Sequence, residues 1–264
     1  MKNRMNMLAT ISVIVIALFI GVAVTSYSQT EKPTEHSVNK IKEVPTVVQD
    51  GMLTEQQREH AKLYDDRGGL GKTIKELVRQ RVEAKSKEEV SIITLPGHAI
   101  LSPDSQDEKD PVQEFVTRAD AVVIGTVKGK VSHITGKGTY IFTDYTLSLE
   151  DVFKNDSSGR LTVGDNIVVT RPGGSVLLDG ITATTFDSEY NLLEVGKKYL
   201  LFLSRVPATG GYQSLNDSSS FLVAGDKAVS INETVNAELP GERSLGAFVV
   251  EVYSALATKP GGNR

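Results

Sequence analysis

The chain has no cysteine and no tryptophan, and only 6% of its 264 residues are aromatic. Without cysteine it can form no disulfide, no thiolate nucleophile and no thiolate metal site, so its stability must come from core burial. The net charge of −4 gives no basic excess for nucleic-acid phosphates, and few aromatic rings are available for base stacking. We therefore expect no nucleic-acid partner.

No motif in the sequence specifies a reaction. A Gly-x-Ser-x-Gly turn and a His-Glu-x-x-His motif are both absent, and no two of the four histidines have metal-ligand spacing within one element. We expect no enzymatic activity, no catalytic residue, no cofactor and no metal. An acidic cluster at residues 104–110 lacks the ligand positions of a calcium loop and is typical of a solvated linker.

The glycine-rich string at residues 67–73 has the appearance of a phosphate-binding loop. Such a loop follows a buried strand, whereas this string follows a charged helical segment and has Asp66 where the standard pattern needs glycine. The context favours a glycine break between two helices, with Thr73 capping the second.

A single long hydrophobic run, Leu8–Val24, lies near the N-terminus and follows Lys2 and Arg4. Its length fits both a short transmembrane anchor and the core of a signal peptide, and small residues favour cleavage after Ser28. Both alternatives stay open for residues 1–30. In either case the positive flank predicts an extracytoplasmic location for the rest of the chain, anchored in the cell membrane or secreted.

The density of charged residues divides residues 31–264 into two regions. In residues 31–110, 29 of 80 side chains are charged, against 31 of 154 in residues 111–264. We expect a polar, partly helical stalk followed by the folded domain, with a linker at residues 102–111. Capping boxes at Thr54 and Thr73 predict two helices in the stalk, the second with an apolar face.

The pattern after Ala119 is that of β-structure. Short apolar or alternating runs predict strands at residues 121–127, 140–149, 167–170, 199–203, 212–215, 221–224 and 228–231. Residues 171–174 are a predicted turn, and Gly225-Asp226 predicts a hairpin between the strands at 221–224 and 228–231. An amphipathic helix ends the domain, with Leu245, Phe248, Val249, Val252 and Leu256 on one face. This predicts a mostly β fold, an antiparallel barrel or sandwich covered on one mouth or flank by the C-terminal helix.

The order of these elements resembles the netrin-like domains, which include the tissue inhibitors of metalloproteases, and their bacterial relatives. The resemblance covers residues 115–231 and is carried by the runs at 119–127 and 145–154, Val163-Gly164-Asp165, Pro172-Gly173-Gly174 and the run at 194–203. It implies a five-stranded OB-like barrel with flanking helices. The inhibitors chelate the protease zinc through an N-terminal cysteine, which this chain lacks, so that mechanism cannot be transferred.

A polar loop with Asp187, Glu189 and Tyr190 lies between two predicted strands. Loops of OB-like folds often form the ligand surface, so this is the candidate ligand loop, and the alternative is a simple exposed turn. The leading functional hypothesis is an extracytoplasmic binding or interaction module whose partner is an envelope or extracellular protein or ligand. The first alternative is a protease-inhibitor-like regulatory domain that acts through barrel loops, and a structural envelope protein is the second.

Overall fold

The computed structural model describes residues 46–47, 53–67, 71–85, 88–94, 111–155, 160–187, 190–231 and 242–258, which all fall in one compact unit. The predicted membrane segment, the predicted cleavage site and the linker up to Asp110 lie outside these residues. Among the described helices, none is long and apolar enough to cross a membrane.

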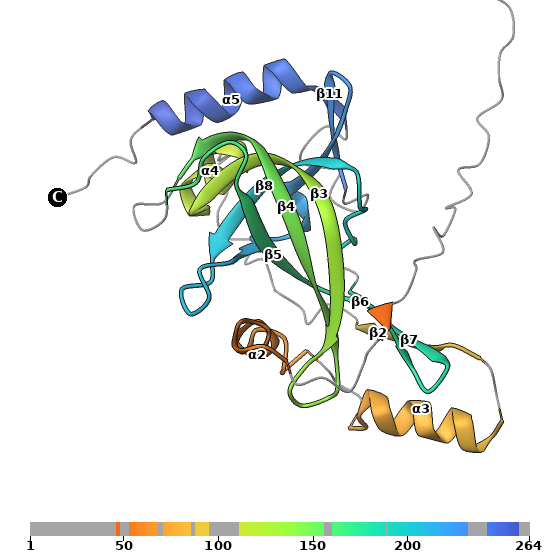
Figure 1. Cartoon of the computed structure of the whole chain (residues 1–264). Helices are drawn as coiled ribbons and strands as arrows, with labels where there is room; N and C mark the ends of the chain where they lie inside the picture. The colour runs from red at the N-terminus through yellow and green to blue at the C-terminus, as the bar shows by residue number, and fades with distance from the viewer. Residues whose placement is uncertain are drawn as a thin grey trace, which may run out of the picture. The chain divides into compact units, whose positions relative to one another are not determined.

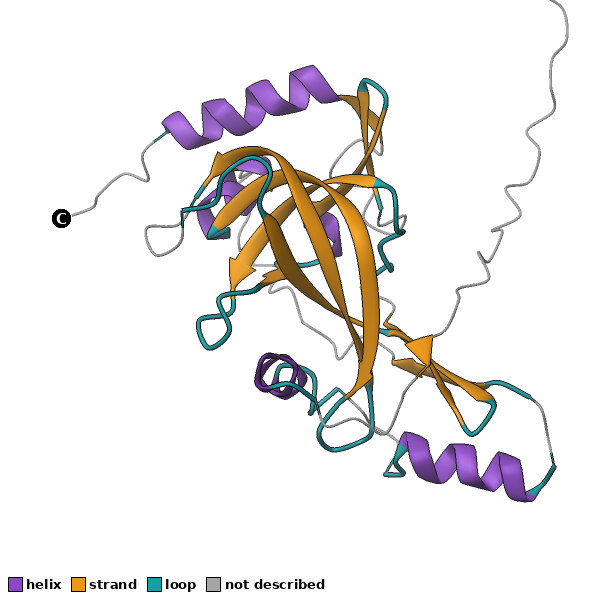
Figure 2. Cartoon of the chain, in the orientation of Figure 1, coloured by secondary structure: helices purple, strands orange, loops and turns teal. Residues whose placement is uncertain are grey.

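The described part of the chain is mostly β-structure (Figures 1 and 2). Its strands are β1 (Thr46–Val47), β2 (Val90–Thr94), β3 (Ala121–Ile134), β4 (Ile141–Lys154), β5 (Asn166–Pro172), β6 (Gly174–Leu178), β7 (Ile181–Asp187), β8 (Lys198–Arg205), β9 (Tyr212–Ser214), β10 (Ser220–Ala224), β11 (Lys227–Ser230) and β12 (Glu242–Ser244). Its helices are α2 (Glu55–Lys62), α3 (Ile74–Glu83), α4 (Pro111–Arg118), α5 (Leu245–Ala257) and the short η1 (Asp217–Ser219).

The strands form two sheets. The main sheet has the order β12-β11-β10-β8-β3-β4-β5-β9, and the small sheet has the order β1-β6-β7-β2. An additional pairing joins β9 to β8, so that β3, β4, β5, β9 and β8 each pair with two others of this group of five. We call these five strands the strand ring. The pair β5–β9 is parallel, and the other four pairs are antiparallel.

Glycines allow this sheet to bend. The β3–β4 pairing has three register shifts, one of them at Gly125, where a Cβ atom would lie 2.8 Å from the carbonyl oxygen of Ser148. At Gly173 and Gly174 the chain passes from the main sheet to the small sheet with φ values of +89° and +143°. The predicted turn at residues 171–174 is thus a switch between sheets, because only glycine adopts these angles without strain.

Both faces are buried along residues 121–127 of β3 and 199–203 of β8, which explains the nearly continuous apolar sequence of these two runs. Val123 and Leu201 belong to the core cluster that mainly side chains of the ring strands form, whereas Val122 and Phe202 belong to the cluster that packs under α4 and α5. In α5 the side chains of Phe248 and Val252 are buried, as the predicted amphipathic face requires. The C-terminal helix therefore covers a flank of the main sheet.

Residues 53–94 differ from the expected solvated stalk. Both predicted helices form, with capping boxes at Thr54 and Thr73. However, Ile74 and Val78 of α3 pack in one core cluster with residues of the small sheet, and β2 pairs with β7. The high charge density of this region reflects the outer faces of its helices, while a few apolar side chains hold it against the β-structure.

Several described elements have no counterpart in the sequence-based prediction. Helix α4 begins at Pro111, the residue that ends the predicted linker, because proline is well suited to the first turn of a helix. The hairpin β6–β7 and the short edge strand β12 are also additional. The hairpin β10–β11, with its turn at Gly225-Asp226, is confirmed.

Candidate functional site

A cluster of polar side chains lies where residues 53–67, here called the α2 segment, contact the β-structure. The Thr54 hydroxyl accepts a hydrogen bond from the Gln57 N–H (3.2 Å), and the Gln57 side chain accepts one from the Thr54 N–H (2.8 Å). This capping box fixes the start of α2, so that His60 and Ala61 of its last turn are buried. Tyr64 follows one turn later and is also buried.

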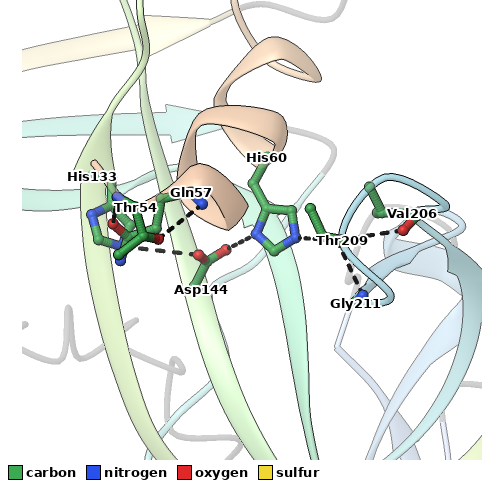
Figure 3. A network of polar contacts seen from close by, with 8 residues as sticks. All are labelled: Thr54, Gln57, His60, His133, Asp144, Val206, Thr209 and Gly211. Atoms are coloured by element: carbon green, nitrogen blue, oxygen red, sulfur yellow. Dashed lines mark hydrogen bonds and ion pairs between the residues drawn. The ribbon is translucent and has the colours of Figure 1, made fainter. Parts of the chain in front are cut away.

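His60 lies between a strand and a turn of the strand ring (Figure 3). Its Nδ1 is 2.9 Å from Oδ1 of Asp144 on β4, and its Nε2 is 3.0 Å from Oγ1 of Thr209 in the β8–β9 turn. A carboxylate only accepts hydrogen bonds, so in the neutral ring Nδ1 carries the proton and Nε2 accepts from the Thr209 hydroxyl. The same hydroxyl accepts from the N–H of Gly211 (3.1 Å). His60 thereby joins three segments far apart in the sequence.

The order carboxylate, imidazole, hydroxyl is also that of a hydrolase triad. In a triad the imidazole must pass a proton to the leaving group, whereas the side chain of His60 is 0% exposed. The Thr209 oxygen is occupied by His60 and by the Gly211 N–H. The arrangement is therefore suited to holding the α2 segment on the strand ring rather than to acyl transfer.

A second histidine faces the same carboxylate. Nε2 of His133 on β3 lies 3.9 Å from Oδ2 of Asp144, and its ring packs against Phe142 with centroids 5.3 Å apart. Burial lowers the pKa of His133 below its usual value, and the nearby His60 adds to this while the Asp144 charge opposes it. His133 is thus held in its neutral form to lower pH than a free histidine.

An ion pair between Arg67 and Asp187 holds the C-terminal end of the α2 segment. Nη1 of Arg67 is 2.5 Å from Oδ2 of Asp187 at the end of β7, and the Tyr140 hydroxyl donates to the same oxygen at 3.0 Å. The Asp187 side chain is 2% exposed. Burial is the largest single influence and opposes the charge on Arg67, but the Asp187 carboxylate together with Tyr190 and Tyr140 outweighs it, so that the pKa of Arg67 rises above its usual value.

Aromatic and guanidinium groups stack in a continuous row along this contact. The Tyr64 ring stacks on Phe142 of β4 with centroids 5.6 Å apart and an interplanar angle of 27°. The Arg67 guanidinium lies 5.9 Å from the centroid of the Tyr64 ring and 5.3 Å from that of the Tyr190 ring. The guanidinium of Arg171 on β5 lies 5.4 Å from the centroid of the same Tyr190 ring. Tyr190 therefore packs with two cations, an arrangement in which the ring quadrupole attracts each of them.

The structure brings two residues of the predicted ligand loop, Asp187 and Tyr190, into this cluster. The N–H of Tyr190 donates to the carbonyl of Asp187 (3.1 Å), and its hydroxyl donates to the carbonyl of Leu215 (3.3 Å). Glu189 lies outside the described residues. The alternative of a simple exposed turn does not fit Asp187, because Arg67 and Tyr140 bury its carboxylate. Ligand binding by this loop stays a prediction.

Sequence reasoning missed His60, Arg67 and Asp144 as members of one cluster. His60 and Asp144 are 84 residues apart, and Arg67 and Asp187 are 120 residues apart, so no local pattern joins them. The one available signal is the spacing of His60, Tyr64 and Arg67, which repeats roughly every helical turn. Among the residues that the structure describes, no group of three or more metal-ligating side chains is arranged to hold a metal ion.

Comparison with known proteins gives no further identification: no family model matches the chain, and no curated protein matches it.

Proposed function

We propose that the chain is an extracytoplasmic binding or interaction module built on an OB-like barrel. The observation that carries this proposal is the connectivity of the strand ring. Four antiparallel pairs and one parallel pair, between its third and fifth strands along the chain, are the pairings of a five-stranded Greek-key barrel. The same connectivity fits the resemblance of residues 115–231 to netrin-like domains.

The extracytoplasmic location rests on the sequence of residues 1–30. The run Leu8–Val24 behind two positive residues directs export, either as a retained anchor or as a signal peptide cleaved after Ser28. In both cases residues 31–264 face an envelope or extracellular partner.

The binding role is supported by the contacts of His60 with Asp144 and Thr209. The one described carboxylate–imidazole–hydroxyl arrangement has a fully buried imidazole, which favours a holding role over proton transfer to a substrate.

In OB-like barrels the turns after the first and fourth strands flank the ligand face. Here these are the β3–β4 turn at residues 135–140 and the β8–β9 turn at residues 206–211.

A site-specific photocrosslinker tests this role in the producing cell. We expect a benzoylphenylalanine at Ala208, in the exposed part of the β8–β9 turn, to form an adduct with one defined envelope or extracellular partner. The matched control is Val163, which is 65% exposed in the turn between β4 and β5, at the opposite end of β4 from the β3–β4 turn. No adduct from Ala208, or equal adducts from both positions, would contradict the proposal.

Two assays of the purified chain separate the other functions. Inhibition of an extracellular metalloprotease would favour the inhibitor-like alternative, which acts through the same turns. Hydrolysis that is lost on changing one buried carboxylate would replace the binding role with an enzymatic one.

A further inference from the structure

Two histidines from distant parts of the chain face one carboxylate (Figure 3). His60 donates from Nδ1 to Oδ1 of Asp144 at 2.9 Å, whereas Nε2 of His133 lies 3.9 Å from Oδ2 of the same group, beyond hydrogen-bond distance. The Nε2 atom of His133 is buried, and among the described residues it has no hydrogen-bond partner. We call His60, Asp144 and His133 the two-histidine cluster.

The α2 segment covers this cluster. Helix α2 contacts β3, and Figure 3 shows Thr54 and Gln57 of its capping box beside the His133 ring. The same ring packs against Phe142, which stacks on Tyr64 of the segment. Water therefore reaches His133 freely only when the α2 segment moves away.

A positive charge on His133 is poorly compensated while the segment stays in place. Asp144 is the carboxylate that faces the ring, but it already accepts from His60, and His60 opposes a second positive charge beside it. The neighbouring elements offer no further anion, since β5 places the uncharged Thr170 opposite Asp144 and the β8–β9 turn contributes the hydroxyl of Thr209. Four charged side chains of α2 pair with one another instead: Glu55 with Arg58, and Glu59 with Lys62.

The α2 segment can open without the strand ring. Helix α2 has eight residues, and isolated helices below about 12 residues are marginal in water, so the segment keeps its fold only through its contacts. Each strand of the ring, by contrast, pairs with two others. Local opening of a weakly held segment costs less free energy than unfolding of the whole chain.

We propose that the two-histidine cluster is an acid-sensitive latch: when His133 takes up a proton, the α2 segment leaves the strand ring while the ring stays folded. Release also frees two turns. The β8–β9 turn loses the contact of Thr209 with His60, and the β3–β4 turn loses Asp65, whose Oδ1 accepts from the N–H of Lys137 at 3.0 Å. These turns flank the face proposed for binding, so the latch controls access to it. This regulatory role rests on the proposed binding function, whereas the release itself does not.

The direction of the pH response follows from the environment of His133. Burial, as the largest cause, lowers the pKa of His133 below its usual value of 6.5. The closed arrangement is therefore favoured above about pH 6.5 and loses that stability as pH falls through the folded pKa. Uptake of one proton on opening shifts the equilibrium by at most about tenfold between pH 7.5 and 5.5. Histidine is the residue type whose charge ordinarily changes in this interval.

Hydrogen exchange of the full chain in mild detergent, at pH 7.5 and 5.5, tests the latch. The readout is the protection factor of the Arg58, Leu63 and Tyr64 amides, which removes the direct effect of pH on exchange. We expect about three- to tenfold lower protection at pH 5.5 in the unaltered chain, and less than about a twofold change in His133→Asn. The matched control is Arg67→Ala, which breaks the ion pair at the other end of the segment. It should lower protection at both pH values and keep the same ratio between them.

Several results would overturn the latch. One is a ratio near one in the unaltered chain, and another is an unchanged ratio in His133→Asn or a lost ratio in Arg67→Ala. A parallel loss of protection in the hairpin β10–β11 would mean unfolding of the whole chain instead. His133→Gln is the second variant if His133→Asn does not fold, and failure of both to fold would make the ring a structural element only.

The latch and the binding function can fail separately. Opening that does not depend on pH, with crosslinking from Ala208 intact, would refute the latch and leave the binding function standing. Opening that follows pH as expected, with no crosslinking from Ala208 at either pH, would support the latch and refute the binding function.

Discussion

Removing the carboxylate of Asp144 should release the α2 segment. The change Asp144→Ala takes away the acceptor 2.9 Å from Nδ1 of His60 and leaves a fully buried imidazole N–H without that partner. An unsatisfied buried donor costs about 1–3 kcal/mol, and a bond to a charged acceptor lies toward the upper end of that range. We take about 2–3 kcal/mol, which corresponds to a 30- to 150-fold increase in the opening of the segment.

Hydrogen exchange measures this opening residue by residue. The N–H groups of Arg58, Leu63 and Tyr64 are hydrogen-bonded within the α2 segment and should lose protection by that factor. Amides in the hairpin β10–β11, remote from the segment, should change much less. The matched control is Asp144→Asn, whose amide oxygen can still accept from His60 and which should lose less than about tenfold. Unchanged protection in Asp144→Ala would refute the view that this contact holds the segment.

Three further outcomes follow from the structure. Arg67→Ala should lower the free energy of unfolding by about 1–3 kcal/mol in urea titration, since the buried Asp187 carboxylate loses its cation. The control is Arg79→Ala, at an exposed ion-pair residue of α3, which should change the free energy of unfolding by no more than about 0.5 kcal/mol. Gly174→Ala should prevent folding, judged by circular dichroism, because a Cβ would lie 2.3 Å from Oγ1 of Thr143 at a φ of +143°. Because the folded chain holds the pKa of His133 below its unfolded value, the stability from that group is present above pH about 6.5 and falls as pH drops through the folded pKa. Urea titrations at pH 7.5 and 5.5 should show this loss, and His133→Asn should reduce it.

Local patterns in the sequence predict local structure well here. The capping boxes at Thr54 and Thr73 predicted the starts of two helices. Short apolar or alternating runs predicted the ring strands, and the helical repeat of apolar residues predicted the buried face of the C-terminal helix. These features depend on neighbours within one or two turns. The mostly β character of the domain is confirmed for the same reason.

Features that depend on contacts between distant parts of the chain could not be predicted from local patterns. The charge density of residues 31–110 indicated a solvated stalk, because a few buried residues such as Tyr64 and Ile74 are outnumbered by the charged outer faces of their helices. The switch between sheets at Gly173-Gly174 was predicted as an ordinary turn. The small sheet that follows it is recognised only from strand pairings between distant parts of the chain. The cluster around Asp144 depends on contacts over more than 80 residues, for which one sequence carries no signal.

The docking of the α2 segment on the strand ring can be measured directly by nuclear Overhauser effects between the rings of Tyr64 and Phe142. With ring centroids 5.6 Å apart, we predict strong cross-peaks and strongly shifted ring resonances for both residues. A Tyr64 ring with unfolded-chain shifts and no cross-peak to Phe142, in a chain whose strand ring is folded, would contradict the docked arrangement.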